Sequence, residues 1–250
     1  MKKMKTPLVL LALLFVGVIQ ISAQSATISV ASFNKIIISP HIEVVLQEGE
    51  EEMVIIEDAE VPRDKINVEV VNGTLKVYLD DAKTYTKSKK IHNEEWSGKH
   101  DIYSGTMVRA SITYKNIRKL SVRGEETIRG VSPIEQQEFE LTIYGESNVF
   151  FNEMSLQNLD VSIYGESYLE IESGSVSQQK YKAYGESEVN TLQMKNSFTK
   201  ITAFGESEFR VRVSDKLKVT SYGEADIEFE GDPDVDKGLV LGEATIRKIG

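Results

Sequence analysis

The chain has 250 residues, a formal net charge of −10 and no cysteine. Its length is sufficient for one large domain, and the lack of cysteine excludes disulfides and an anchor on a lipidated cysteine. The acidic excess argues against nucleic acid and anionic membrane surfaces as partners, because both are bound through Lys and Arg.

Residues 1–23 predict a secretory signal peptide. Basic residues precede an apolar run from Pro7 to Ile21, and Ser22-Ala23-Gln24 offers small residues for cleavage. A retained membrane anchor is the alternative, but the run is short for a membrane span. Cleavage leaves residues 24–250 as one domain without a membrane span and with a charge of −13. We expect it outside the cytoplasm, in the periplasm, on the outer surface or secreted.

Residues 24–80 are predicted to form an irregular β part. Short apolar or β-branched runs separated by turn-like residues lie at 36–38, 42–46 and 53–56. Two alternating stretches flank Asn72-Gly73, the dipeptide most typical of a tight β-hairpin turn. No window of helical period occurs here.

Residues 81–107 are polar and interrupt this pattern. We expect an exposed insertion loop, since long segments without periodicity are either functional or disordered. The only Trp, Trp96, suggests the alternative of a flap over a binding surface. His92 and His100 are a weaker metal-site hypothesis, because no third ligand stands at a recognisable spacing.

In residues 108–250 a short phrase recurs: an aromatic residue, Gly, Glu, and then Ser or Ala. Its clear copies begin at Tyr144, Tyr164, Tyr184, Phe204 and Tyr222. Degenerate copies surround Gly124 and Gly242, and successive glycines are 18 to 21 residues apart. A period near 20 residues is typical of a stacked-repeat fold.

Apolar and polar residues alternate around each phrase, which indicates a strand with one buried face. The small Gly and Ser mark a bend or a close approach of the opposite wall. One strand for each step, followed by a polar return such as 153–158 or 174–179, predicts equivalent strands that stack in parallel about 4.8 Å apart. We therefore predict an all-β fold, a single-stranded right-handed parallel β-helix (a β-solenoid) with rungs of about 20 residues. A leucine-rich repeat would need Asn or Cys after its strand.

Four stretches match the phrases of a known family: Phe33-Asn34-Lys35-Ile36, residues 42–49, Asn72-Gly73-Thr74-Leu75 and residues 117–122. In these stretches the chain resembles the GIN-domain family, putative head domains of auto-transporter adhesins that are exported and common in Bacteroidetes. The resemblance implies an extracytoplasmic β-helix without established catalytic residues. The family usually has Gly-Ser-Gly or Gly-Ser-Ala in each rung, so it does not account for Glu at the middle position. The insertion at 81–107 also looks longer than is usual in the family.

Stacking turns each recurring position into an outward row. The aromatic row consists of Tyr144, Tyr164, Tyr184, Phe204 and Tyr222. Ring stacking would stabilise the rungs, whereas contiguous exposed aromatics often mark a surface for sugar rings or an apolar partner. We take this row, with Glu146, Glu166 and Trp96, as the candidate ligand face.

An acidic row runs two residues beyond the aromatic one. Like charges opposite each other destabilise neighbouring strands, so the row is either a solvated stripe or a cation site. Several carboxylates suit Ca²⁺, and the densest candidate ligands are Glu186, Glu188, Glu206, Glu208, Glu224 and Asp226. The chain lacks the Gly-Asp nonapeptide of Ca²⁺-binding toxin repeats, and no other cofactor is predicted.

No residue is predicted to be catalytic. Gly145-Glu146-Ser147 is not a nucleophile elbow, because Val149 stands where the second Gly should be. A uniform Glu row gives no reason for one carboxyl to have a raised pKa.

We therefore expect a non-catalytic binding or structural module of the cell envelope, adhesin-like, with a glycan or an envelope or surface protein as partner. The alternatives are a carbohydrate- or Ca²⁺-binding surface protein and, last, a polysaccharide lyase, for which Arg210 or Arg212 would be the base. Self-association through the edge of the last rung is also open.

Overall fold

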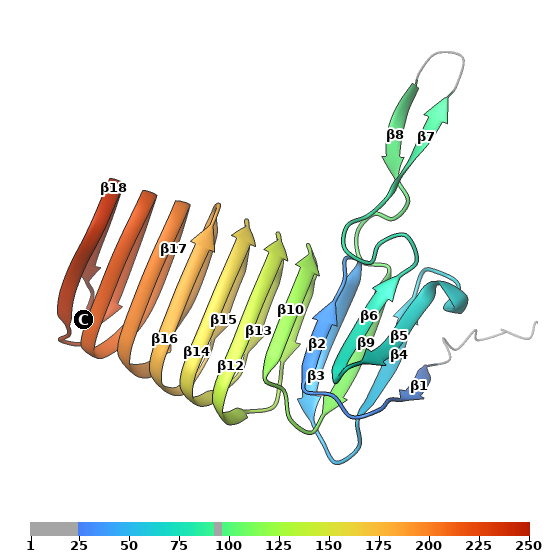
Figure 1. Ribbon diagram of the computed structural model, residues 1–250, viewed down its shortest axis with the longest axis horizontal. Coiled ribbons are helices and arrows are strands. Elements are labelled where there is room, and N and C mark those ends of the chain that lie inside the picture. Colours follow the sequence, from blue (N-terminus) through green and yellow to red (C-terminus); the bar gives the residue numbers. More distant parts are fainter. Residues whose placement is uncertain (1–24, 93–96) are drawn as a thin grey trace, which may run out of the picture.

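The computed structural model describes residues 25–92 and 97–250, which form two sheets (Figure 1). Sixteen strands make one continuous sheet that winds into a β-solenoid, and two strands make a separate hairpin. The predicted all-β solenoid is thus confirmed. The predicted signal peptide, residues 1–23, and Trp96 lie outside the described residues. Within the described ranges, no helix is long and apolar enough to cross a membrane.

The N-terminal part joins antiparallel strands to the start of the solenoid. Its elements are β1 (Ala26–Ser29), β2 (Lys35–Ile38), β3 (Ile42–Glu48), β4 (Met53–Ala59), the 3₁₀-helix η1 (Arg63–Lys65), β5 (Ile66–Val71) and β6 (Thr74–Leu79). The hairpin predicted at Asn72-Gly73 is confirmed, because β5 and β6 pair antiparallel. Both turn residues have positive φ, 51° at Asn72 and 68° at Gly73, as a type I′ turn requires.

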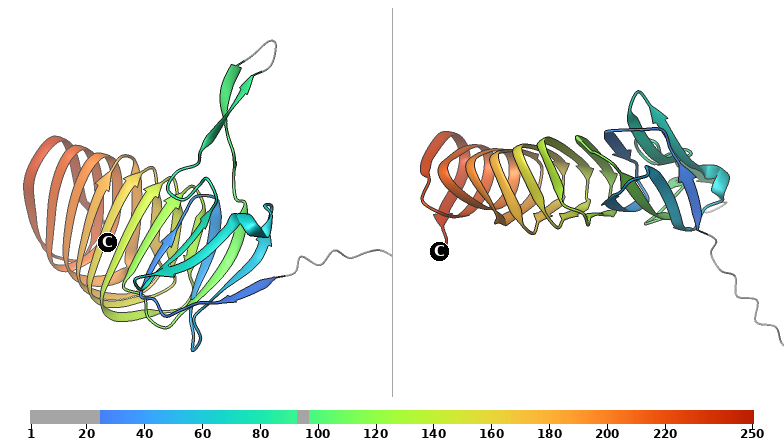
Figure 2. Two further views of the ribbon diagram at one scale, coloured as in Figure 1. Left: turned by 45° about the vertical axis from the view of Figure 1, so that its right-hand side comes forward. Right: turned by 90° about the horizontal axis from the view of Figure 1, so that it is seen from below.

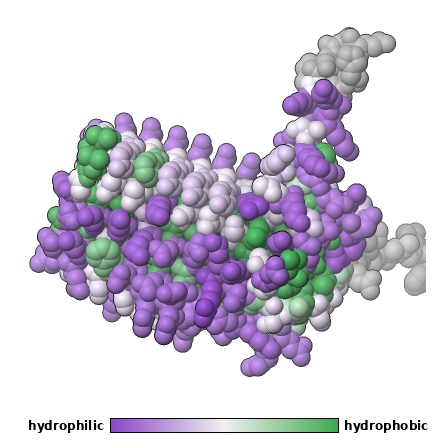
Figure 3. Space-filling view, viewed as in Figure 1, coloured by the Kyte–Doolittle hydropathy of each residue, from purple (hydrophilic) through white to green (hydrophobic). Residues whose placement is uncertain are grey.

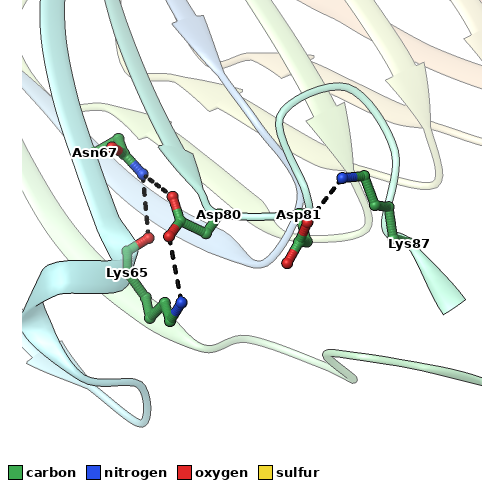
Figure 4. Close-up of polar contacts among 5 residues, drawn as sticks. All are labelled: Lys65, Asn67, Asp80, Asp81 and Lys87. Carbon is green, nitrogen blue, oxygen red and sulfur yellow. Dashed lines mark hydrogen bonds and ion pairs between the residues drawn. The ribbon is translucent and has the colours of Figure 1, made fainter. Parts of the chain in front are cut away.

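The segment predicted as a loop carries β7 (Ser88–His92) and β8 (Ser97–Asp101), which pair as a hairpin. This hairpin projects away from the body (Figures 1 and 2). At its base Lys87 forms an ion pair of 2.8 Å with Asp81, beside a cluster around Asp80 (Figure 4). Lys89 is paired with His100, and His92 with Ser97, so the register does not place the two histidines opposite each other.

The remaining strands form the regular solenoid. They are β9 (Val108–Tyr114), β10 (Lys119–Gly124), β11 (Thr127–Gly130), β12 (Ile134–Gly145), β13 (Asn148–Phe151), β14 (Met154–Gly165), β15 (Tyr168–Ile171), β16 (Gly174–Tyr184), β17 (Ser187–Glu230) and β18 (Asp234–Lys248). The predicted parallel stacking is confirmed, since Tyr144 pairs with Tyr164 and Gly145 with Gly165. The handedness stays a prediction.

The prediction of a single strand followed by an irregular return was wrong for the regular turns. From β10 to β15 each turn holds two strands separated at the phrase, such as β12 and β13. The expected polar returns are themselves strand, because Met154 pairs with Gly174 and Leu156 with Val176. The polar side chains there face outward, while Met154, Leu156 and Val176 are buried.

The phrase forms the corner between the two strands of a turn. Gly165 has φ +125°, and a Cβ there would stand 2.3 Å from the carbonyl oxygen of Gly145 in the preceding turn. That oxygen accepts hydrogen bonds from the backbone N–H of Glu166 at 3.0 Å and from the hydroxyl of Ser167 at 2.9 Å. Gly permits the bend and the close approach, and Ser satisfies the second lone pair of the carbonyl.

The solenoid interior is mainly apolar, and its C-terminal half holds a buried polar network. Tyr181 donates to the Gln179 side-chain oxygen, Gln179 donates to Thr199, and Thr199 donates to Asn196. Burial raises the pKa of Tyr181, so its hydroxyl stays a neutral donor. Because each member has a partner, the network can be buried without a large desolvation cost.

β18 closes the solenoid and pairs only with β17 among the described strands. Leu239 and Leu241 on β18 are 53% and 56% exposed. Figure 3 shows hydrophobic atoms at this end, whereas hydrophilic atoms repeat along the rungs. Self-association through this edge stays a prediction.

We expect Gly165→Ala to destabilise the protein by about 3 kcal/mol or more, because the methyl group meets a backbone carbonyl that cannot move alone. The melting temperature should fall by at least about 6 °C. Gly105→Ala is the matched control, since Gly105 has φ +66° but nothing within 4 Å of an added Cβ. It should cost about 1 kcal/mol. Equal losses for the two variants would contradict the close-approach argument.

Candidate binding site

The aromatic row is a continuous ring stack along the corner of the solenoid. Centroids of neighbouring rings from Tyr144 to Tyr222 are 4.7 to 5.0 Å apart, and their planes differ by 2° to 10°. At one end the Arg123 guanidinium lies 5.8 Å from the centre of the Tyr144 ring. At the other end Leu241 pairs with Tyr222 in the register.

This stack changes what the aromatic row can offer to a ligand. Tyr144, Tyr164 and Tyr222 are 41%, 39% and 37% exposed, but the faces of neighbouring rings are against each other. A sugar ring would need a free face to stack on. The row therefore presents ring edges and phenol groups, and its stacking directly stabilises adjacent turns.

The acidic row lies beside a shallow recess of about 400 Å³ on the other side of the corner. The recess is lined by Asn148, Glu166, Ser167, Tyr168, Glu186, Ser187, Glu188, Glu206, Ser207 and Glu208. The structure thus brings together five of the predicted acidic residues: Glu166, Glu186, Glu188, Glu206 and Glu208. Glu146, Glu224 and Asp226 lie outside this lining. Burial is the largest cause of a raised pKa at Tyr168, and the Glu170 and Glu188 carboxylates raise it further.

The five recess carboxylates form no ion pair with the described part of the chain, in contrast to acidic groups elsewhere on the solenoid. On the other faces, basic residues pair with acidic residues of adjacent turns: Lys119–Glu140, Lys180–Asp160, Arg210–Glu228, Arg212–Glu230 and Lys218–Asp236. At the corner, carboxylates from consecutive turns lie together without an ion-pair partner among the described residues. It is therefore the candidate binding site.

The predicted calcium ligands are not gathered into a preformed metal site. Within residues 25–92 and 97–250, no group of three or more His, Asp or Glu side chains is placed to hold a metal ion. Calcium binding by Glu186, Glu188, Glu206, Glu208, Glu224 and Asp226 stays a prediction. Arg210 and Arg212, the bases considered for a lyase, are held in ion pairs with Glu228 and Glu230.

Sequence reasoning missed a polar junction between the hairpin and the first repeat. His41 has φ 71°, and its ring nitrogens contact the Gly105 carbonyl at 2.7 Å and the Thr86 hydroxyl at 2.6 Å. Nδ1 also lies 3.8 Å from the Glu126 carboxylate. The sequence offered one signal of this junction. In a degenerate copy of the phrase, Glu126 stands where the clear copies have Ser or Ala.

Glu126 occupies the position that Ser147 has in the next turn, because Gly124 pairs with Gly145 and Thr127 with Asn148. Its carboxylate accepts a hydrogen bond from the backbone N–H of Glu125 at 3.1 Å. In the next two turns the corresponding N–H, that of Glu146 or Glu166, donates to the preceding Gly carbonyl. Glu126 therefore supplies the acceptor that the first corner lacks. Burial raises the pKa of this carboxyl, against the opposing effect of its hydrogen bonds.

Comparison with known proteins agrees with this architecture. A family model described as "Putative auto-transporter adhesin, head GIN domain" matches residues 32–233. No curated protein matches the chain.

Solved structures resemble the chain in fold. A putative adhesin from Bacteroides fragilis is 17% identical with a TM-score of 0.74, covering 90% of this chain and 96% of its own. A putative adhesin from Parabacteroides merdae is 16% identical with a TM-score of 0.65, at 91% and 96% coverage. A putative lipid binding protein from Parabacteroides distasonis is 17% identical with a TM-score of 0.62, also at 91% and 96% coverage.

We expect Tyr184→Ala to lower the free energy of unfolding by about 1–3 kcal/mol, because the ring stacks on two neighbours. Tyr184→Phe keeps both stacking contacts and should change stability by less than about 0.5 kcal/mol. Urea titration followed by circular dichroism measures both. A similar loss in the two variants would mean that the hydroxyl, not the stack, stabilises the corner.

Glu126→Gln should raise the melting temperature at pH 8, because it removes a buried charge and keeps an oxygen acceptor for the Glu125 N–H. A raised carboxyl pKa means that the folded state favours the neutral acid. The wild type should therefore gain stability as the pH falls through that raised pKa, down to the ordinary value of about 4.3. The advantage of Glu126→Gln should shrink over this range in thermal scans. Glu135→Gln, at an exposed position, is the control, and an advantage independent of pH would contradict the assignment.

Proposed function

The chain belongs to the family of the putative auto-transporter adhesin head GIN domain, and on that basis we propose that it is a non-catalytic, adhesin-like binding protein of the cell envelope. The family description supports a location outside the cytoplasm. The predicted signal peptide at residues 1–23 agrees with export.

The unneutralised acidic corner carries this proposal. Solvated like charges about 5 Å apart cost on the order of 1 kcal/mol per neighbouring pair even in water. Elsewhere on the same solenoid, several ion pairs join opposite charges of adjacent turns. A partner that supplies positive charge or hydrogen-bond donors would relieve the repulsion at the corner. The acidic row thus favours the binding of a partner, although it does not stabilise the fold.

The chemistry of the recess defines the ligand. Its carboxylates accept hydrogen bonds. The serine hydroxyls of the recess already donate to glycine carbonyls, and the Tyr168 hydroxyl donates to Glu170. The ligand must therefore be rich in donors and free of anionic groups at the points of contact. The site repeats along the solenoid axis about every 4.8 Å, which suits a linear ligand. We propose a neutral or amino-sugar glycan chain, with a basic segment of a surface protein as the alternative.

A glycan array tests the proposal. We expect neutral and amino-sugar chains to bind and uronic-acid chains not to bind. The double variant Glu186→Gln and Glu206→Gln should weaken binding at least about tenfold, since it removes charge-assisted hydrogen bonds from two adjacent turns. The control is Glu135→Gln with Glu172→Gln, two exposed residues outside the recess.

A preference for uronic-acid chains, or equal binding by both double variants, would contradict the assignment of the corner. If the protein bound only a basic peptide, and the double variant Glu186→Gln and Glu206→Gln lost that binding, the ligand would be a basic segment of a surface protein and not a glycan. Repeating the array with millimolar Ca²⁺ tests the calcium hypothesis, which requires a gain that the recess variant loses.

A further inference from the structure

The two ends of the solenoid differ in how the core is covered. At the N-terminal end, the antiparallel strands β1, β4 and β5 extend the sheet beyond the parallel strands, and Phe33, Ile56 and Ile66 are no more than 6% exposed. At the C-terminal end, β18 is the last strand and pairs only with β17 among the described strands (Figure 1). The end of a repeat array needs a cap with a polar outer face. Within the described residues, no such cap follows β18.

The last turn leaves part of the core open. Ala244 and Ile246 of β18 pair with Ala225 and Ile227 of β17, so the four residues hold equivalent interior positions. Ala225 is 5% exposed and Ile227 is fully buried. Ala244 and Ile246 are only partly buried, although they pack against the same core. No further turn covers them among the described residues, so solvent or a partner takes its place.

The free edge of β18 is long and only partly protected. The strand has 15 residues, and a strand edge presents unpaired backbone N–H and C=O groups. An irregularity in register at residues 238–239 interrupts the edge, as bulges do on many protected edges. From 240 to 248 the register is regular and the sequence has no proline. Leu239 and Leu241 are exposed on the same strand. An apolar edge of this kind is a template for another strand.

The length and shape of this edge favour a second copy of the chain as the partner. The other free edges in the described ranges belong to short strands: β1 and β5 at the far end have four and six residues, and β7 and β8 of the hairpin have five each. β18 also bends at its corner, where Gly242 has φ 118°. A head-to-tail contact with β1 or β5 would leave most of β18 unpaired. Another β18 matches both its length and its bend.

The charges along β18 favour a partner strand that runs in the opposite direction. Asp234 and Asp236 precede the corner, whereas Arg247 and Lys248 follow it. Two identical ends that face each other are related by a twofold axis, so their last strands run antiparallel. With the axis near the corner, the acidic part of each strand lies against the basic part of its partner. All four side chains already pair with the preceding turn, so the second copy extends existing rows of ion pairs.

We propose that the protein forms a twofold dimer in which the β18 edges of two copies pair antiparallel. The pairing satisfies the free backbone groups of both edges, and each copy covers the open end of the other's core. The acidic recess is lined by residues of earlier turns, between 148 and 208, so the dimer leaves both recesses accessible. The inference does not depend on the ligand proposed for the recess.

Sedimentation-velocity centrifugation of the whole protein over a wide range of concentrations tests the proposal. We expect a dimer that does not grow further, because a twofold contact is closed. Leu239→Lys with Leu241→Lys should raise the dissociation constant of the dimer at least about tenfold, since charges on an edge oppose pairing. Val131→Lys is the control, because Val131 is an apolar residue 40% exposed in an earlier turn, and it should leave the dimer intact.

A charge-reversal pair tests the antiparallel direction. One variant carries Asp234→Lys and Asp236→Lys, and the other carries Arg247→Glu and Lys248→Glu. Each variant alone should dimerise at least about tenfold more weakly, because it places like charges opposite each other. An equimolar mixture of the two should recover dimers, since one contact is then native and the other is reversed on both sides. Circular dichroism checks that each variant is folded.

A monomeric wild type at all concentrations would overturn the proposal, as would growth into longer assemblies. Equal dimerisation by the Leu239 and Leu241 double variant and by Val131→Lys would remove the contact from β18. Failure of the mixed charge variants to recover dimers would overturn the antiparallel arrangement. The variant Glu186→Gln with Glu206→Gln should dimerise normally, so the loss of ligand binding at the recess and the loss of the dimer are separate outcomes.

Discussion

The carbonyls of Gly124 and Gly145, which each accept two hydrogen bonds from the following turn, make the contact on which the regular turns depend. The Gly145 oxygen receives the N–H of Glu166 and the hydroxyl of Ser167. This contact fixes the register, so the residues before and after each Gly must superimpose from turn to turn. The aromatic stack and the converging Glu side chains are consequences of the same geometry. Superposition stabilises the aromatic row, because its rings stack, and destabilises the acidic row, because its charges repel each other.

At the two ends of the solenoid, other residues take the place of the hydrogen bonds to the glycine carbonyl. At the first corner no glycine precedes Gly124, and the Glu126 carboxylate supplies the missing acceptor. His41 then connects Glu126 to the segments that precede and follow the projecting hairpin, through Thr86 and Gly105. At the last turns Ala225 and Ala244 replace the serine, and β18 is left with exposed apolar side chains. The first corner therefore uses side chains that do not occur in the repeat. The last turns keep the repeat but lose the serine hydroxyl.

Periodicity in the sequence was sufficient to predict parallel stacking, the two outward rows and the hairpin at Asn72-Gly73, because each depends on local alternation or turn chemistry. It could not locate the second strand of each turn, since alternation continues through Gly145 while the backbone bends. The hairpin formed by β7 and β8 was missed because its strands consist mostly of polar residues, such as the cross-strand pair Lys90 and Lys99. The His41–Glu126 contact joins residues that are distant in sequence, and only the winding of the chain brings them together.

The energies at the corner explain how an unpaired acidic row persists. Each stacked aromatic pair contributes about 0.5–1.5 kcal/mol beyond the area that it buries. Each pair of neighbouring solvated carboxylates costs on the order of 1 kcal/mol. Because both rows repeat once per turn at the same corner from Tyr144 to Tyr222, the two effects nearly cancel in these turns. The stack thus lets the protein keep a line of uncompensated charge on a rigid support. Binding of a partner that supplies hydrogen-bond donors there is favoured twice, because it reduces the repulsion between the carboxylates and adds its own contacts.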